Sequence, residues 1–312
     1  MKRILIVKMS SLGDLFHALP AVHMIRQHTG ASIDWVVHDL YADLVRCFPD
    51  VDRVIAFPRR NFLANRRAFG EALRAESYDL ALDMQGLLKS ALVARFARAA
   101  RRVGPSFSRE GARLFYDEVA GPRNKNRHAV EENLDTVRRL GIPVGEVVFP
   151  VHFPDRPLDL ASPRVGLLPC SRRLEKNWPP ERFVELARAL RAQAGASLVL
   201  LGSPADAPVC AAIAQAVGEG ATDLCGTTTM IELGGVLREL DLLVTVDSGP
   251  MHMAAAVGTP TVAVFGPTDP IKTGPYGERH HVVKQGERLT DLPAAPVLEA
   301  ALRALAIGAP SR

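Results

Sequence analysis

Long apolar runs and paired cysteines are both missing from this chain of 312 residues. No apolar run approaches the roughly 18 residues that indicate a membrane-spanning helix. The run near the start, Ile4 to Val7, ends at Lys8 and is too short for the apolar part of a signal peptide, so we expect a cytoplasmic protein. No C-x-x-C spacing is present, which favours reduced thiols over a disulfide framework or a metal site; the cysteines are Cys47, Cys170, Cys210 and Cys225.

Several nucleotide-binding motifs are also lacking. No strand-like run is followed by G-x-G-x-x-G, which argues against a dinucleotide oxidoreductase. The motif G-x-x-x-x-G-K-[ST] is also absent, which argues against a P-loop nucleotidase. No D-x-D pair follows a strand, as a metal-diphosphate site would require. Only 6% of the residues are aromatic and zinc-finger spacing is absent, so nucleic acid is the weakest candidate partner.

The net charge of +4 hides an uneven distribution. Residues 1–156 hold 24 Lys and Arg against 18 Asp and Glu, whereas residues 157–312 hold 14 against 16. The excess is concentrated in residues 53–127, which hold 16 against 7, a net charge of +9. Such a stretch is either an ordinary solvated surface or a face that meets an anionic partner, with a membrane surface or an acidic substrate ahead of nucleic acid.

Short apolar runs alternate with amphipathic stretches in the first half of the chain. Strand composition is found in RILIVK, SIDWVVH, VDRVIAF, YDLALDM and, as a short candidate, RRVG. Helical periodicity marks residues 14–27, 66–75, 89–99 and 128–140. Interleaved strands and helices predict an α/β fold with a parallel sheet covered on both faces.

The alternation stops at residues 141–163, which are rich in proline and lack helical periodicity, and it begins afresh after them. We therefore predict two doubly wound, Rossmann-like domains, residues 1–156 and residues 157–312. Ligands of such domains bind at the carboxyl ends of the strands, so two of these edges are expected to face each other across a cleft. The loops that follow strands are accordingly the candidate functional segments.

The first such loop, SSLGD, lies between a strand and a helix. Ser11 and Asp14 have the spacing of a capping box, which is a purely structural arrangement. Gly13 adds what capping does not need, because it lets a ligand approach the backbone where the N–H groups of the first helical turn attract anions. An ionised Asp14 at that position would also be able to accept a proton from a substrate hydroxyl. The two interpretations are compatible.

A second loop, DSGPMH, follows an apolar strand that ends at Asp247. Plain helix capping by Asp247 or Ser248 is one interpretation. The other is an anion cradle made by the N–H groups of Ser248 and Gly249, with His252 in the first turn near the same ligand. FGPTDP follows the next strand and is expected to shape the same pocket.

A third loop, PCSRRLEKNWPPE, occupies in the second domain the place that SSLGD has in the first. It carries hydrogen-bond donors beside a helix start, including Ser171 and Lys176. Surface solvation is the simpler interpretation of Arg172 and Arg173. Lys176 is better positioned for a ligand, since it precedes Trp178 and a proline pair.

In combination, KMSSLGD, DMQGLLKS, SRRLEKNWP and DSGPMHMAAAVGTPTVAVFGPTDP resemble glycosyltransferase family 9, the ADP-heptose:lipopolysaccharide heptosyltransferases. The resemblance extends over nearly the whole chain, and IDWVVH, VDRVIAFPRR and SREGARLFY are most similar to members that add the first heptose to the inner core. It implies a GT-B fold in which the first domain binds the acceptor and the second binds the donor. It also implies that a helix at about residues 294–307 crosses back onto the first domain.

The resemblance implies roles for individual residues. Asp14 would be the general base, and Lys176, aided by Ser171, would neutralise the diphosphate of ADP-L-glycero-β-D-manno-heptose without a metal or a cofactor. Further donor contacts would come from Gly13, Asp206, Thr228, Asp247, Ser248, Gly249 and His252. The acidic groups of a lipid A acceptor that carries Kdo would meet Arg59, Arg60, Lys89 and Arg109.

Two positions depart from the family pattern. Asp206 stands where the family often has a glutamate that contacts the ribose, and Arg172 stands where a hydroxyl residue is typical. The implied reaction is one inverting displacement, on a protein held peripherally at the cytoplasmic face of the inner membrane. Rival interpretations are transfer to a later inner-core heptose or another acceptor, a nucleotide-sugar epimerase of the same fold, and a regulator that binds nucleotide sugars without catalysis.

Overall fold

The computed structural model describes residues 1–124 and 126–308 and separates the chain into two compact units. Unit 1 ends at His152 and unit 2 begins at Phe153, a few residues before the predicted boundary. Phe153 belongs to unit 2 because its ring packs against Gly234, where an added Cβ would lie 2.4 Å from it. Arg238 also donates a hydrogen bond of 2.9 Å to the Phe153 carbonyl.

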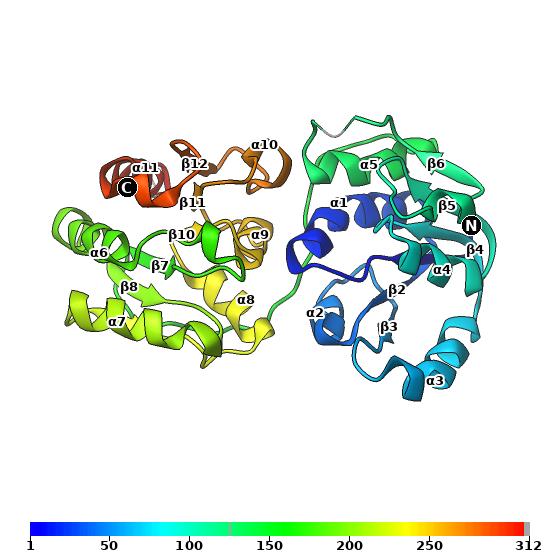
Figure 1. The fold of residues 1–312 in the computed structure, drawn as a ribbon, viewed down its shortest axis with the longest axis horizontal. Coiled ribbons are helices and arrows are strands. Elements are labelled where there is room, and N and C mark those ends of the chain that lie inside the picture. Colours follow the sequence, from blue (N-terminus) through cyan, green and yellow to red (C-terminus); the bar gives the residue numbers. More distant parts are fainter. Residues whose placement is uncertain (125, 309–312) are drawn as a thin grey trace. The chain divides into compact units, whose positions relative to one another are not determined.

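Unit 1 is built around one parallel sheet with the order β3-β2-β1-β4-β5-β6 (Figure 1). Its strands are β1 (Arg3–Val7), β2 (Ser32–His38), β3 (Arg53–Phe57), β4 (Ser77–Asp83), β5 (Arg98–Pro105) and β6 (Glu118–Ala120). Its helices are α1 (Leu12–Thr29), α2 (Ala42–Val45), α3 (Phe62–Arg74), α4 (Leu88–Phe96) and α5 (Ala129–Arg139), with short 3-10 turns η1 (Asp39–Tyr41) and η2 (Ala112–Phe115).

Unit 2 repeats the architecture, with the sheet order β12-β11-β10-β7-β8-β9. Its strands are β7 (Arg164–Leu168), β8 (Ser197–Leu200), β9 (Ala221–Asp223), β10 (Leu242–Val246), β11 (Thr261–Phe265) and β12 (His280–Lys284). Its helices are α6 (Pro180–Ala194), α7 (Ala207–Val217), α8 (Met230–Glu239), α9 (Gly249–Ala256), α10 (Pro270–Thr273) and α11 (Ala294–Gly308), with 3-10 turns η3 (Leu174–Lys176), η4 (Pro204–Asp206) and η5 (Leu289–Asp291).

The central strands are largely apolar because helices cover both faces of each sheet. Ile4, Leu5, Ile6 and Val7 of β1 are fully buried, and every residue of β10 is buried. Both sheets start in the middle, build outward to one edge and then return to build outward on the other side. Each therefore has a switch point, between β1 and β4 in unit 1 and between β7 and β10 in unit 2. The fold class predicted from the alternation is confirmed.

The observed bounds of some elements differ from the predicted ones. The helix predicted for residues 89–99 ends at Phe96, because Ala97 is extended and Arg98 and Ala99 pair with Ser77 and Tyr78 of β4. The short elements β6, β12, α2 and α10 lie outside the predicted ones, since three to five residues carry too little periodicity to be recognised.

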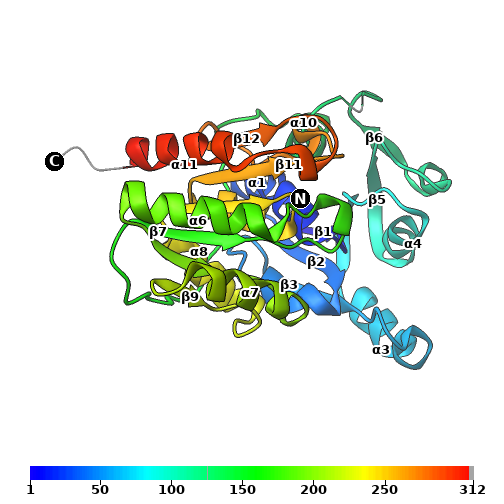
Figure 2. The same cartoon turned by 60° about the vertical axis from the view of Figure 1, so that its left-hand side comes forward.

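The final helix, α11, buries its apolar face in unit 2. Val297, Ala300, Ala301 and Ala304 belong to the same hydrophobic core as the strands β7, β10 and β11. The helix runs beside α6, as both views show (Figures 1 and 2). The expected crossing of this helix onto the first domain stays a prediction.

Candidate functional site

The carboxylate of Asp14 stands at the start of α1, just beyond the carboxyl end of β1. Its Oδ2 accepts hydrogen bonds from the Ser11 backbone N–H (2.7 Å) and the Ser11 hydroxyl (2.8 Å). Its Oδ1 lies 4.0 Å from Nδ1 of the buried His17, and 40% of the side chain is exposed. The predicted capping contact is therefore real, and it uses one carboxylate oxygen of a side chain that stays partly exposed.

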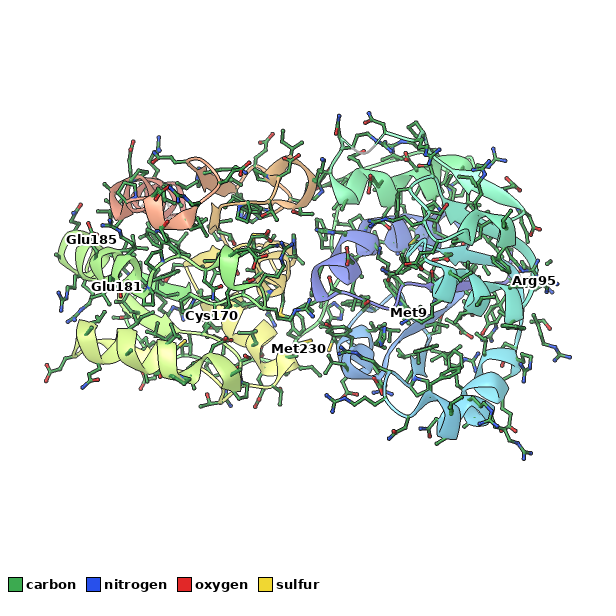
Figure 3. The ribbon with its side chains drawn as sticks, in the orientation of Figure 1. Met9, Arg95, Cys170, Glu181, Glu185 and Met230 are labelled. Atoms are coloured by element: carbon green, nitrogen blue, oxygen red, sulfur yellow. The ribbon has the colours of Figure 1, made fainter. Side chains whose placement is uncertain are left out.

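The loop that carries Ser11 is held from the neighbouring strand by Gln85. Gln85 Oε1 accepts hydrogen bonds of 3.1 Å from the backbone N–H groups of both Met9 and Ser10. The clamp spans the switch point, because Met9 follows β1 and Gln85 follows β4 (Met9 is labelled in Figure 3). Gln85 lies in the DMQG segment, and no role was predicted for it from the sequence. Its signal was the position of an amide directly after a strand.

Two buried charged groups lie beneath this loop, and neither was predicted. Asp83 Oδ1 accepts hydrogen bonds from the backbone N–H groups of Gln85 (2.8 Å) and Gly86 (3.0 Å), and Oδ2 accepts one from the Tyr116 hydroxyl (2.6 Å). Burial raises the pKa of Asp83, which these hydrogen bonds oppose. Lys8 Nζ donates a 2.6 Å hydrogen bond to the Met84 carbonyl, and burial lowers the pKa of Lys8, opposed by Asp14 and Asp83.

The basic residues assigned to the acceptor lie around the same strand ends. Lys89 Nζ is 3.4 Å from Nε2 of His38 and 5.2 Å from the centre of the Phe57 ring. Burial lowers the pKa of Lys89, and the positive charge of Arg59 lowers it further, so the structure brings these two cations together.

Arg60 and Arg109 are less directly connected to the others. Arg60 is exposed beside Arg59, and Arg109 is tied to the site through its backbone N–H, which donates to the Gly86 carbonyl at 2.8 Å. These contacts place Arg109 near the end of β4, but the acceptor roles of all four cations stay predictions.

The corresponding edge of unit 2 is centred on a buried ion pair. Lys176 Nζ is 2.6 Å from Oδ2 of Asp247, and only 15% and 7% of the two side chains are exposed. Lys176 comes from η3 after β7 and Asp247 directly follows β10, so the pair spans the second switch point (Cys170, also after β7, is labelled in Figure 3). Thr268 donates a 2.6 Å hydrogen bond to the same oxygen of Asp247. Thr268 lies in the FGPTDP segment that was expected to shape this pocket.

The start of α9 completes this edge. Ser248 is the N-cap residue, Pro250 lies in the first turn, and Ser248 Oγ is 3.2 Å from Oγ1 of Thr245. His252 is buried in the first turn of the same helix. Ser171 is fixed by its backbone N–H, which donates to Asn177 Oδ1 at 2.7 Å.

Asp206 lies at the end of the next strand, β8. Its Oδ2 accepts hydrogen bonds from the Ser203 backbone N–H (2.8 Å) and hydroxyl (2.6 Å), which is the same local arrangement as Ser11 and Asp14. The backbone passes close behind it, since a Cβ on Gly202 would lie 3.0 Å from Cβ of Asp206. Thr228 is half-buried in the loop after β9. The structure thus gathers the predicted donor residues of unit 2 at one sheet edge.

Across residues 1–124 and 126–308, no three His, Cys, Asp or Glu side chains are arranged to hold a metal ion. None of the helices described there is both long and apolar enough to cross a membrane.

Comparison with known proteins adds independent information. The sequence model of Glycosyltransferase family 9 (heptosyltransferase) matches residues 66–293. Lipopolysaccharide heptosyltransferase 1 of Escherichia coli K12 is 35% identical, over 95% of this chain and 98% of its own. The protein of the same name from Pseudomonas aeruginosa is 32% identical, over 95% of this chain and 86% of its own.

Solved structures agree with this match. The structure described as E. coli heptosyltransferase WaaC with ADP superimposes with a TM-score of 0.86 at 31% identity, covering 97% of this chain and 99% of that one. The same enzyme with ADP-2-deoxy-2-fluoro heptose gives a TM-score of 0.83 at 31% identity, covering 98% of this chain and all of the other.

Proposed function

Because this chain belongs to glycosyltransferase family 9, the heptosyltransferases, we propose that it transfers L-glycero-D-manno-heptose from ADP-heptose to a Kdo residue of the lipopolysaccharide inner core. The donor is suggested by the ADP-heptose analogue in the related WaaC structure, and the acceptor by the names of the relatives. The reaction is a single displacement with inversion at the anomeric carbon.

The observation that carries this proposal is the unequal use of the two Asp14 oxygens. Ser11 holds Oδ2 through two hydrogen bonds, which fixes the plane of the carboxylate. Oδ1 is not used by Ser11, and the side chain is 40% exposed at the carboxyl end of β1, where doubly wound domains bind their ligands. A fixed, ionised oxygen in that position suits a general base, which must lie within hydrogen-bonding distance of the proton it removes.

In the proposed reaction, Asp14 Oδ1 accepts the proton of an acceptor hydroxyl as that oxygen attacks the anomeric carbon of the heptose. The bond to the ADP oxygen breaks on the opposite face, through a transition state with oxocarbenium character, by analogy with glycoside hydrolysis. The leaving diphosphate gains negative charge. The Lys176 ammonium and the N–H groups at the start of α9 are the groups of unit 2 suited to stabilise it.

The ion pair between Lys176 and Asp247 positions a cation for the diphosphate of the donor. Asp247 holds the Lys176 ammonium near the end of β10, and Thr268 fixes the same Asp247 oxygen. A lysine ammonium has three donors, so it can keep one bond to Asp247 and direct the others to phosphate oxygens. Asp247 would then orient Lys176, and its free oxygen would be available to a sugar hydroxyl.

Mass spectrometry of a Kdo-bearing lipid A acceptor, incubated with ADP-heptose and this protein, tests the substrates. We expect a mass gain of one heptose. If ADP-heptose binds but only acceptors that already carry heptose gain mass, the acceptor is a later inner-core heptose. Conversion of the sugar without any acceptor would indicate an epimerase, and absence of both ADP release and sugar conversion would leave a binding protein.

We further propose that the protein works in the cytoplasm, at the surface of the inner membrane. The support is chemical, because a lipid A acceptor is anchored in a bilayer and the stretch 53–127 carries a net charge of +9, from 16 Lys and Arg against 7 Asp and Glu. A protein that reaches such an acceptor by peripheral contact needs no helix that crosses the membrane.

A further inference from the structure

One side of unit 1 exposes large apolar side chains from three neighbouring elements. Leu63 of α3 is 72% exposed, Phe96 of α4 is 62% exposed and Leu114 of η2 is 87% exposed. The helices α3 and α4 bury their other sides in one hydrophobic cluster under the sheet, so they cover the same face of it. The turn η2 packs directly against α4. We call the outer surface of these three elements the α3–α4–η2 face.

The α3–α4–η2 face is also strongly basic. Its only ion pair within the described residues joins Arg67 and Glu71, both largely exposed. Side chains with positive charge come from α3, α4, η2, the loops that precede α3 and η2, and the first residue of β5, and they are Arg59, Arg60, Arg66, Arg67, Arg74, Lys89, Arg95, Arg98, Arg109 and Arg113. Arg95 lies on the outer side of α4 (Figure 3). An excess of positive charge together with exposed leucine and phenylalanine is therefore the character of this surface, with Glu71 and Glu110 as its acidic side chains.

This combination discriminates between the possible anionic partners. Nucleic acid binding needs cations, with aromatic rings placed for base stacking, and exposed leucines contribute nothing to it. A bilayer surface matches both features, because apolar side chains enter the boundary between headgroups and acyl chains while arginines meet anionic headgroups. The arginine stem is itself apolar and reaches along such a boundary with its guanidinium in the headgroup layer.

We propose that the α3–α4–η2 face docks on an anionic lipid bilayer, with Leu63, Phe96 and Leu114 entering the interface and the surrounding arginines contacting lipid phosphates. This inference deepens the proposed function and rests on it for its biological sense, since a lipid-borne acceptor would lie in the same bilayer. The cations predicted to bind the acceptor adjoin this face, because Arg59 and Arg60 precede α3, Lys89 lies in α4 and Arg109 precedes η2.

Sedimentation of the full-length protein with vesicles tests the proposal. The vesicles contain phosphatidylglycerol with phosphatidylethanolamine, or phosphatidylcholine alone as the neutral comparison. We expect binding to the anionic vesicles, at least roughly ten-fold weaker binding to the neutral ones, and loss of most binding at about 0.5 M salt, where surface charges are screened. Equal binding to both vesicle types, or to neither, would overturn the proposal.

Paired substitutions then locate the surface. Phe96→Glu with Leu114→Glu should weaken vesicle binding by roughly ten-fold or more, because each places a carboxylate where an apolar side chain enters the bilayer. The matched control is Ile271→Glu with Arg279→Glu on unit 2, where Ile271 is 68% exposed and Arg279 is exposed. The control should bind as the wild type does. If the control loses binding equally, the α3–α4–η2 face is not the docking surface.

Two additions keep the outcome interpretable. Arg95→Glu with Arg98→Glu tests the same face through charge alone, should circular dichroism show that the apolar pair fails to fold.

Heptose transfer to a deacylated, water-soluble acceptor is measured for every variant and should be unchanged from wild type. Failure of wild-type transfer would count against the proposed function, whereas intact transfer with unaltered vesicle binding in the variants would count against the docking surface. Binding of the face to RNA instead of vesicles would also overturn the proposal.

Discussion

At the scale of single residues, Asp14 combines a structural contact with an accessible reactive oxygen. One oxygen accepts both hydrogen bonds from Ser11, and the other lies 4.0 Å from Nδ1 of His17 in a side chain that is 40% exposed. The same pairing of serine and aspartate recurs at Ser203 and Asp206 in unit 2. A capping contact therefore does not by itself identify a catalytic aspartate. Substitutions must separate the capping role from the role as general base.

Asp14→Asn should keep the cap and remove the base. Asparagine offers one carbonyl oxygen that can accept the bonds from Ser11, so we expect the free energy of unfolding to change by less than about 1 kcal/mol. Asp14→Ala removes the cap and should cost about 0.5–2 kcal/mol. Urea denaturation of both variants measures the difference. Equal destabilisation by the two substitutions would mean that the asparagine does not preserve the cap.

Gln85 is predicted to position Asp14 through the loop that joins them. Gln85→Leu leaves the N–H groups of Met9 and Ser10 without their acceptor, at a cost of roughly 1–3 kcal/mol for each that stays buried. Gln85→Glu keeps an acceptor oxygen of the same reach and should lose less stability and less turnover. Denaturation and steady-state kinetics of both variants provide the test. A glutamate variant as impaired as the leucine variant would contradict the clamp.

How far a contact can be predicted depends on how far apart its partners lie in the sequence. The contact between Ser11 and Asp14 is local, with a spacing of three, and the capping pattern predicted it. Gln85 reaches Met9 across 76 positions and Lys176 reaches Asp247 across 71. Such contacts depend on which strands are adjacent. Alternation indicates a parallel sheet but leaves open that β1 pairs with β4, and β7 with β10.

At the scale of elements, the buried strands in the sheet centre were predicted, and so was the edge strand β3. β1, β4, β7 and β10 carry long apolar runs because helices cover both of their faces. The missed strands β6 and β12 are short edge strands, and β12 shows intermediate or exposed residues throughout. Edge strands bury one side at most, so their sequences are less apolar and resemble loops.

The edge strand β12 begins with a histidine whose titration should affect stability. Burial lowers the pKa of His280 to about 4, with smaller contributions from His281 and Arg279. The unfolded chain then binds a proton between about pH 6.5 and pH 4 that the folded chain does not, so stability falls as pH falls through this range. From pH 7 to pH 5 we expect a loss on the order of 1–2 kcal/mol.

Urea denaturation at pH 7 and pH 5, with His280→Gln as the comparison, checks this prediction. Glutamine does not titrate, so the variant should lose most of the pH dependence assigned to this site. His281→Gln, one position along the strand, is the matched control and should retain it. An unchanged pH dependence in His280→Gln would show that other groups are responsible.

At the scale of the whole molecule, two copies of one architecture carry different chemical groups at equivalent places. Each sheet has its switch point after its first and fourth strands, where ligands bind to doubly wound domains. Unit 1 presents a carboxylate there, Asp14, with the buried Lys8 nearby, and unit 2 presents an ammonium group, Lys176, beside a helix start. A base and a phosphate site are thus assigned to separate units, which suits a reaction between two substrates.

This separation predicts that the diphosphate of the donor is held chiefly by unit 2. Lys176→Met removes a charged donor worth roughly 1.5–3 kcal/mol to a phosphate, so the Kd for ADP should rise roughly 10- to 100-fold. Isothermal titration calorimetry measures it. Arg172→Met, an exposed cation on the same loop, is the control and should change the Kd little. A comparable loss in both variants would mean that general charge, rather than Lys176, holds the diphosphate.

The central claim is that Asp14 removes the acceptor proton, and the most direct test is the heptose-transfer rate of Asp14→Asn beside the wild type. The rate is followed by mass spectrometry on the Kdo-bearing acceptor at saturating ADP-heptose. We predict a loss of roughly 10²–10⁴-fold in turnover, with the Kd for ADP unchanged, because asparagine cannot accept the proton. Turnover within a few-fold of wild type would contradict the account and leave Asp14 as a helix cap.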